Sequence, residues 1–82
     1  MTRCSGYVVG SNESPRGGVT WRVRVKDEKS PQQNQVLVVA SVKEGIALAQ
    51  GLNVNFIVGT VDGESSQKVL RAVDVALEEV VN

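Results

Sequence analysis

Hydrophobic and polar residues alternate without interruption from residue 19 to residue 26. One set of alternate positions is apolar and the other is basic or polar: Val19, Trp21, Val23 and Val25 against Thr20, Arg22, Arg24 and Lys26. Successive side chains of a β-strand point to opposite faces, so a period of two is typical of a half-buried strand. The pattern predicts a strand with an apolar face toward a core and a basic face toward solvent.

Three further strands follow from shorter patterns. Residues 5–10 predict a first strand, and Pro15 with Gly17-Gly18 predicts a loop over 11–18. The nearly continuous apolar run at 36–40 predicts a third strand over 35–42, covered on both faces and central in the sheet. Residues 53–61 alternate again and end at Asp62-Gly63, a pair suited to a tight turn.

The connections between these strands differ in character. Residues 28–34 are polar, contain Pro31 and predict a hairpin loop. Residues 43–51 predict one or two helical turns, because Ile46, Leu48 and small residues lie between Gly45 and Gly51, which would end the helix. The sequence thus predicts a short helical link before the fourth strand.

Residues 65–82 fit two interpretations. On a helical wheel the apolar side chains of residues 69–81 fall within one half-circle, apart from Val75, which favours an amphipathic helix. As a strand, Val69, Val73 and Val75 share a face with Arg71. The helix would give an α+β fold, a four-stranded antiparallel sheet with a C-terminal amphipathic helix over 65–81. Periodicity alone leans toward the helix.

Three stretches carry a resemblance to a known family. They are Gly6-Tyr-Val-Val with Arg16-Gly-Gly-Val-Thr-Trp21, then residues 45–58 (GIALAQGLNVNFIV), then Ala72-Val-Asp-Val75. With the order of elements, this chain resembles the cold-shock branch of the OB-fold family. The resemblance implies a mainly β fold, a small five-stranded OB-like barrel formed by one domain over 1–82, with residues 67–77 as the fifth strand. We favour that strand because barrel closure removes exposed edges.

The aromatic motifs with which that family binds nucleic acid are largely absent. Where the family has a Lys-Gly-Phe-Gly-Phe motif, this chain has Arg16-Gly-Gly-Val-Thr-Trp21, and where it has Val-Phe-Val-His-Phe, residues 36–40 read VLVVA. Stacking on an aromatic ring contributes about 1–3 kcal/mol per base, and one tryptophan does not make a platform. Any binding of nucleic acid would therefore depend on phosphate contacts, and it would be weak, salt-dependent and largely insensitive to sequence.

The charged residues are divided unequally between the two halves. The chain has nine Lys and Arg against nine Asp and Glu, yet residues 1–43 carry seven of the cations and three of the acids. This asymmetry is explained first by solvated surface charge. It also fits an anion-binding face, or attraction between the two halves within one molecule or between neighbouring molecules.

The composition argues against histidine-based catalysis, an internal disulfide and a four-thiolate zinc site. The chain contains no histidine and a single cysteine, Cys4, which removes the usual general base, an internal disulfide and a four-thiolate zinc site. We expect no enzymatic activity, no metal and no cofactor. We also expect a cytoplasmic protein without membrane contact, because no signal-peptide pattern is present and the longest apolar run is too short to span a bilayer.

Two functional hypotheses remain. The first is a non-enzymatic OB-like module that binds single-stranded RNA or DNA weakly through the basic strand face. Its candidate anion-binding residues are Arg16, Trp21, Arg22, Arg24, Lys26 and Lys43, although the register of Trp21 with three valines favours core packing for that ring. The second is a protein-interaction or self-assembly module of the same fold that binds no nucleic acid.

Overall fold

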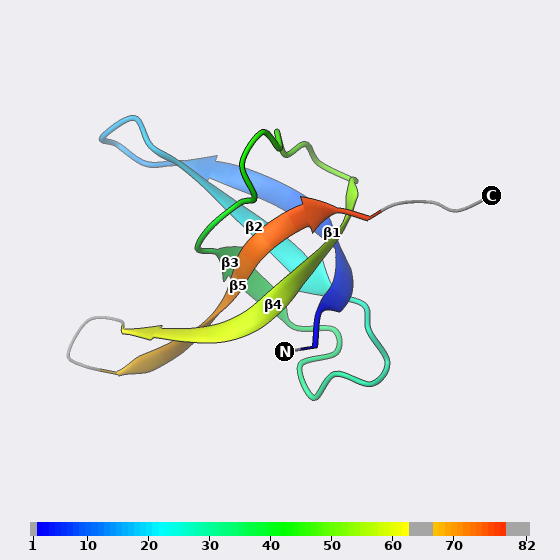
Figure 1. Cartoon of the computed structure of the whole chain (residues 1–82). Helices are drawn as coiled ribbons and strands as arrows, with labels where there is room; N and C mark the ends of the chain where they lie inside the picture. Colours follow the sequence, from blue (N-terminus) through cyan, green and yellow to red (C-terminus); the bar gives the residue numbers. More distant parts are fainter. Residues whose placement is uncertain (1, 63–66, 79–82) are drawn as a thin grey trace.

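Five strands close into a barrel in the computed structural model of the chain, which describes residues 2–62 and 67–78 (Figure 1). The strands are β1 Cys4–Glu13, β2 Val19–Val25, β3 Val36–Val39, β4 Asn53–Asp62 and β5 Lys68–Leu77. Their order around the barrel is β1-β2-β3-β5-β4. The prediction of a mainly β, five-stranded closed barrel is confirmed.

One parallel strand pair closes an otherwise antiparallel barrel. β1 pairs antiparallel with both β2 and β4, and the pairs β2–β3 and β4–β5 are antiparallel too. β3 and β5 run parallel, with Val38 opposite Arg71 and Val39 opposite Ala72. This arrangement is compatible with an OB-like fold.

The barrel interior is filled by one aromatic ring and small aliphatic side chains. Every strand contributes to the core, which consists of Val8, Val23, Val25, Leu37, Val54, Phe56, Ala72 and Val75. Phe56 is the largest of them and is fully buried. Gly6 of β1 makes room for this ring, because a Cβ atom at Gly6 would lie 2.8 Å from Cε1 of Phe56. The apolar alternation in β2 therefore packs against Phe56 and the valines of the other strands.

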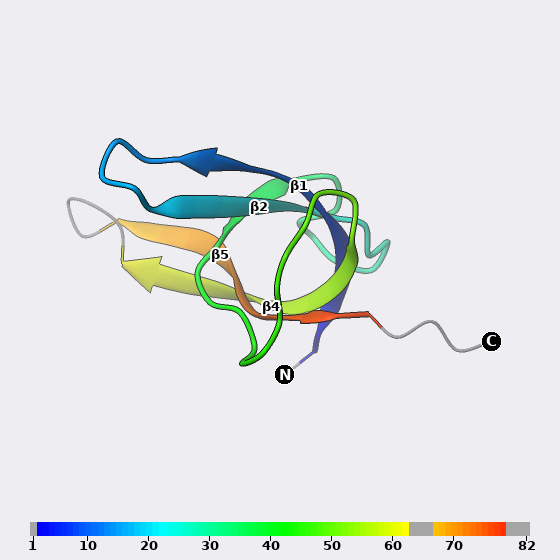
Figure 2. The same cartoon turned by 90° about the horizontal axis from the view of Figure 1, so that it is seen from above.

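Two hairpins extend beyond the closed part of the barrel on the same side (Figures 1 and 2). β1 and β2 stay paired as far as Glu13 and Val19, and β4 and β5 as far as Asp62 and Lys68. β1 and β4 pair with each other only over residues 4–7 and 53–56. In the described part of the chain, residues 57–62 of β4 thus pair along one edge only. The first strand also continues through residues 11–13, where a loop was predicted, because these residues pair along β2.

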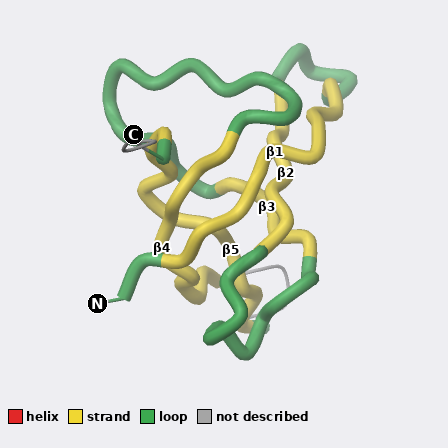
Figure 3. The backbone as a smooth tube through the Cα atoms, turned by 90° about the vertical axis from the view of Figure 1, so that its right-hand side faces the viewer, coloured by secondary structure: helices red, strands yellow, loops and turns green. Residues whose placement is uncertain are grey.

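The predicted helical link between the third and fourth strands is wrong. No helix occurs among residues 2–62 and 67–78, and the chain from 40 to 52 runs as loop and turns (Figure 3). Gly45 and Gly51 adopt φ values of 84° and 90°, which interrupt helical geometry at both ends of the segment. The amide of Lys43 instead donates a hydrogen bond to the carbonyl of Val75 at 2.8 Å, and Val42 forms a bridge with Val75. β5 therefore fixes the start of this link in an extended form.

Residues 68–77 form a strand, so the alternative α+β fold with a helix over 65–81 is wrong for the described part of that segment. Residues 65, 66 and 79–81 lie outside the described residues. A bulge explains why the pattern resembled a helix. Two β5 residues, Asp74 and Val75, lie opposite one β4 residue, and Asp74 has a φ of 55°. The bulge moves Val75 onto the core face with Ala72, and this spacing of three is also found on one face of a helix.

Candidate anion-binding face

The strand register aligns five residues in one row across the outside of the barrel. Arg22 of β2 lies opposite Gly10 of β1 and opposite Val38 of β3, and Arg71 of β5 lies opposite Val38 and opposite Gly59 of β4. The row therefore runs Gly10, Arg22, Val38, Arg71, Gly59. The next residues along β2, β3 and β5 are the buried Val23, Leu37 and Ala72, so the row faces away from the core.

A second row lies beside the first. Tyr7 of β1 is opposite Arg24 of β2, which is opposite Val36 of β3. Lys26 extends over the Tyr7 ring, with its Nζ atom 5.6 Å from the ring centroid, a distance at which a cation is attracted to an aromatic face. We call Tyr7, Arg22, Arg24, Lys26 and Arg71 the basic face. It joins one partly exposed aromatic ring of β1 with two arginines of β2, one arginine of β5 and Lys26, which directly follows β2.

The cations of the basic face have no carboxylate partner in the described part of the chain. The ion pairs found there are Arg3 with Asp74 and Lys68 with Asp62. Arg24 and Arg71 each donate one hydrogen bond to a backbone carbonyl, of Asn34 at 2.9 Å and of Leu70 at 3.1 Å. Since no acid of the described segments pairs with these guanidinium groups, they retain there the positive charge that attracts an anion.

Arg22 is the least satisfied of these residues. Its Nε atom is shielded from solvent and has no hydrogen-bond partner. A shielded donor without an acceptor is unfavourable, and a movement of the side chain toward a phosphate oxygen would supply the missing acceptor. Arg22 is therefore suited to pair with an anion that reaches the row.

Arg71 is the residue of this face that sequence reasoning missed. The chain was divided into a basic first half and an acidic second half, and Arg71 lies in the second. The strand interpretation did place it on one face with Val69 and Val73, but only the parallel pairing of β3 with β5 brings it beside Val38. Tyr7 was likewise assigned to no face, because a short strand framed by glycines does not reveal which side is buried.

The structure brings Arg22, Arg24 and Lys26 together and separates the other predicted site residues from them. Arg16 lies exposed in the turn between β1 and β2. Lys43 lies in the loop after β3, where it lines a polar hollow with Arg3, Asn55 and Glu78. Trp21 is partly buried and packs against the core, on the face of β2 opposite to Arg22. Its ring therefore contributes to packing beside the row, not to the surface of the row.

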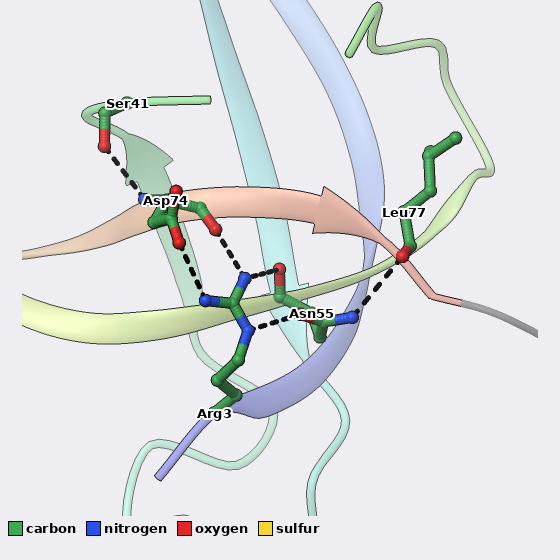
Figure 4. A network of polar contacts seen from close by, with 5 residues as sticks. All are labelled: Arg3, Ser41, Asn55, Asp74 and Leu77. Carbon is green, nitrogen blue, oxygen red and sulfur yellow. Dashed lines mark hydrogen bonds and ion pairs between the residues drawn. The ribbon is translucent and has the colours of Figure 1, made fainter. Parts of the chain in front are cut away.

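Asp74 lies at the centre of a polar network at the bulge of β5 (Figure 4). The Nη1 atom of Arg3 donates to Oδ2 of Asp74 at 2.9 Å, and Arg3 also donates to the side chain and carbonyl of Asn55. The amide of Asp74 donates to Oγ of Ser41 at 2.8 Å. These contacts hold the bulge of β5 against the residue before β1, and they engage the Asp74 carboxylate away from the basic face.

An apolar hollow adjoins the row at its far end. It has a volume of about 570 Å³ and is lined by Ile57, Val58, Gly59, Thr60, Val61 and Val73. Ile57, Gly59 and Val61 alternate on the outer side of β4, and Gly59 has no side chain to fill the space between the other two. We call this the Gly59 hollow. Its floor residue, Gly59, is the direct cross-strand partner of Arg71.

The described part of the chain offers no metal site and no membrane-spanning helix. No group of three or more His, Cys, Asp or Glu residues there could hold a metal ion. None of the described segments forms a helix with the length and apolar character needed to cross a membrane. The chain matches no family model, no curated protein and no solved structure.

Proposed function

We propose that this protein is a non-enzymatic OB-like binding module that holds single-stranded nucleic acid through the basic face. The observation that carries the proposal is the row Arg22, Val38, Arg71. Its two arginines flank a small aliphatic side chain and pair with no carboxylate among residues 2–62 and 67–78. Guanidinium groups match the geometry of phosphate oxygens and bind them in a bidentate manner. Arg24 of β2 and Lys26, directly after β2, extend the same charge along the chain.

Tyr7 adds the second element that a single-stranded ligand requires. Its side chain is partly exposed on the basic face, between Arg24 and Lys26. Stacking of one base on an aromatic ring contributes about 1–3 kcal/mol, so Tyr7 would supplement phosphate contacts without providing sequence selectivity. The proposed binding is therefore mainly electrostatic and largely independent of sequence.

The test is a fluorescence-anisotropy titration of a labelled single-stranded oligonucleotide over a series of salt concentrations. Four phosphate contacts predict a slope of log K against log salt of about −3, and removal of two should halve it. Arg22→Ala with Arg71→Ala should show that reduced slope and weaker binding. Lys29→Ala with Lys68→Ala removes the same charge elsewhere, and it should bind nearly as the wild type does. Absence of binding at low salt, or equal losses in both double variants, would refute the proposal.

A second candidate function, self-assembly, is favoured by one feature of β4. Residues 57–61 pair along one edge only in the described part of the chain, and they carry no charged residue or proline. Strand edges of this kind are templates for pairing with another chain. Light scattering over a range of protein concentrations tests this function, and a monomer at all concentrations would exclude it.

A further inference from the structure

The position of the Gly59 hollow beside the basic face limits which classes of polyanion fit this surface. Arg71 is opposite Gly59 on one side and opposite Val38 on the other. The row therefore ends at Gly59, which lines the hollow, and Arg71 lies one strand away from it. Neighbouring strands lie about 4.8 Å apart, which places Gly59 one strand spacing and Arg22 two spacings from Arg71. A phosphate held at Arg71 would therefore have an apolar recess next to it.

The walls of this recess are suited to a flat apolar group. Ile57 and Val61 flank Gly59 on β4, and Val73 of β5 forms a third wall. The absent side chain is what keeps the recess open: a Cβ atom built on Gly59 would lie 3.1 Å from Cγ2 of Val73. At the other end of the row, a Cβ atom on Gly10 would meet nothing within 4 Å. The row thus ends beside an open apolar hollow at Gly59, whereas at Gly10 a Cβ atom would have no neighbour.

We propose that the Gly59 hollow receives a nucleobase of the strand whose phosphates contact Arg22 and Arg71. A nucleotide combines a flat, largely apolar ring with a neighbouring anion, and the hollow beside Arg71 complements that combination. Polyanions that lack such rings would use the arginines alone. This inference rests on the proposed function and deepens it, because it distinguishes nucleic acid from other polyanions.

The experiment compares an oligothymidylate with an abasic oligomer of equal length and equal phosphate number. Both oligomers are bound to the Tyr7→Ala variant, which lacks the ring proposed above to stack a base, and the hollow variants are made in this background. There the oligothymidylate should bind about tenfold more tightly at constant salt, an increment within the range of one base contact. Gly59→Val fills the hollow, so it should remove most of this increment and leave the affinity for the abasic oligomer unchanged. Gly10→Val is the matched control and should keep the increment.

A second variant guards against a folding defect in Gly59→Val. Ile57→Ala removes one wall of the hollow and adds no atoms, and it should reduce the increment several-fold. Circular dichroism and the unchanged affinity for the abasic oligomer report that the barrel and the basic face are intact.

Each remaining outcome has a definite meaning. Equal affinity of the Tyr7→Ala variant for both oligomers, or an unchanged increment when Gly59→Val or Ile57→Ala is added to it, overturns the inference and leaves the proposed function standing. Failure of both oligomers to bind at low salt refutes the proposed function and the inference with it. A concentration-dependent dimer that Gly59→Val converts to a monomer would assign the hollow to a second copy of the chain, and that result also overturns the inference.

Discussion

Arg22 and Arg71 come from opposite halves of the chain and lie on either side of Val38, which pairs with Arg22 along one edge of β3 and with Arg71 along the other. The antiparallel β2–β3 pair and the parallel β3–β5 pair together create this arrangement. Since Val38 is small and neighbouring strands lie about 4.8 Å apart, the two side chains can approach one phosphate from both sides. The pairing of strands, rather than the sequence order, thus determines the charge of this face.

Val38 provides a direct test of this arrangement. Val38→Glu places a carboxylate between the two guanidinium groups, where it would pair with them and exclude a phosphate. We expect at least a tenfold loss of affinity for single-stranded oligonucleotide in the anisotropy titration, since a charge-assisted hydrogen bond contributes about 1.5–3 kcal/mol. Val38→Gln has nearly the same size without the charge and should lose little. Similar losses in the two variants would contradict a role of the paired arginines.

The separation of Arg16 and Lys43 from the basic face predicts a different response. Arg16→Ala with Lys43→Ala removes two cations, as Arg22→Ala with Arg24→Ala does, but the first pair lies in the β1–β2 turn and in the loop after β3. We expect the first double variant to lose less than threefold in affinity at moderate salt, because exposed charges more than about 8–10 Å from the ligand are screened. A loss of affinity as large as that of Arg22→Ala with Arg24→Ala would show that net charge, rather than the position of the charges, governs binding.

The bulge at Asp74 predicts unequal costs for two neighbouring valines. Val75 is fully buried in the core, whereas Val73 lies on the outer face opposite Ile57. Val75→Ala should lower the free energy of unfolding by about 2 kcal/mol, because it removes buried methyl groups and leaves a cavity. Val73→Ala should cost less than about 1 kcal/mol. Urea unfolding measures both free energies of unfolding. Equal losses in the two variants would be inconsistent with a bulge that places Val75 on the core face and leaves Val73 outside.

Gly6 and Gly10 of β1 predict a similar contrast. A Cβ atom at Gly6 would overlap the carbonyl oxygen of Arg24 and press against the buried ring of Phe56, while one at Gly10 would meet no atom within 4 Å. Gly6→Ala should therefore lower the free energy of unfolding by at least about 1 kcal/mol. Gly10→Ala should change the unfolding midpoint little. A Gly6→Ala protein as stable as the wild type would argue against the close packing of β1 over Phe56.

The strand of residues 19–25 could be predicted from sequence because its alternation is complete. The barrel buries Val23 and Val25 on the apolar face, buries Trp21 in part and leaves Val19 exposed. The apolar run at 36–40 correctly predicted a strand, but the expectation of a central strand covered on both faces was wrong. The sheet closes into a barrel, and Val36 is exposed on its outside while Leu37 is buried. In residues 68–77 the periodicity was ambiguous, because one bulge at Asp74 turned a period of two into a spacing of three. Closure of the barrel, argued from the avoidance of open edges, identified the strand where periodicity did not.

Other features depended on contacts between distant segments. The segment after β3 contains Ile46 and Leu48 between two glycines, a composition that fits a short helix as well as a loop. What decides its form is the bridge from Val42 and Lys43 to Val75, which no local pattern reveals. Arg71 belongs to the basic face for the same kind of reason, because only the parallel β3–β5 register brings it beside Val38. Local alternation therefore identified the part of the face on β2 and missed the part on β5.

The central claim, that the row across β2, β3 and β5 is the surface to which single-stranded nucleic acid binds, is tested most directly by NMR. Titration of the ¹⁵N-labelled protein with an oligonucleotide at low salt should shift the amide signals of Arg22, Val38 and Arg71 and their cross-strand neighbours, with Arg side-chain Nε signals moving in parallel. The signals of Lys29 and of the loop at residues 44–50 should stay in place. Shifts confined to those loops, or no shifts at low salt, would contradict the account.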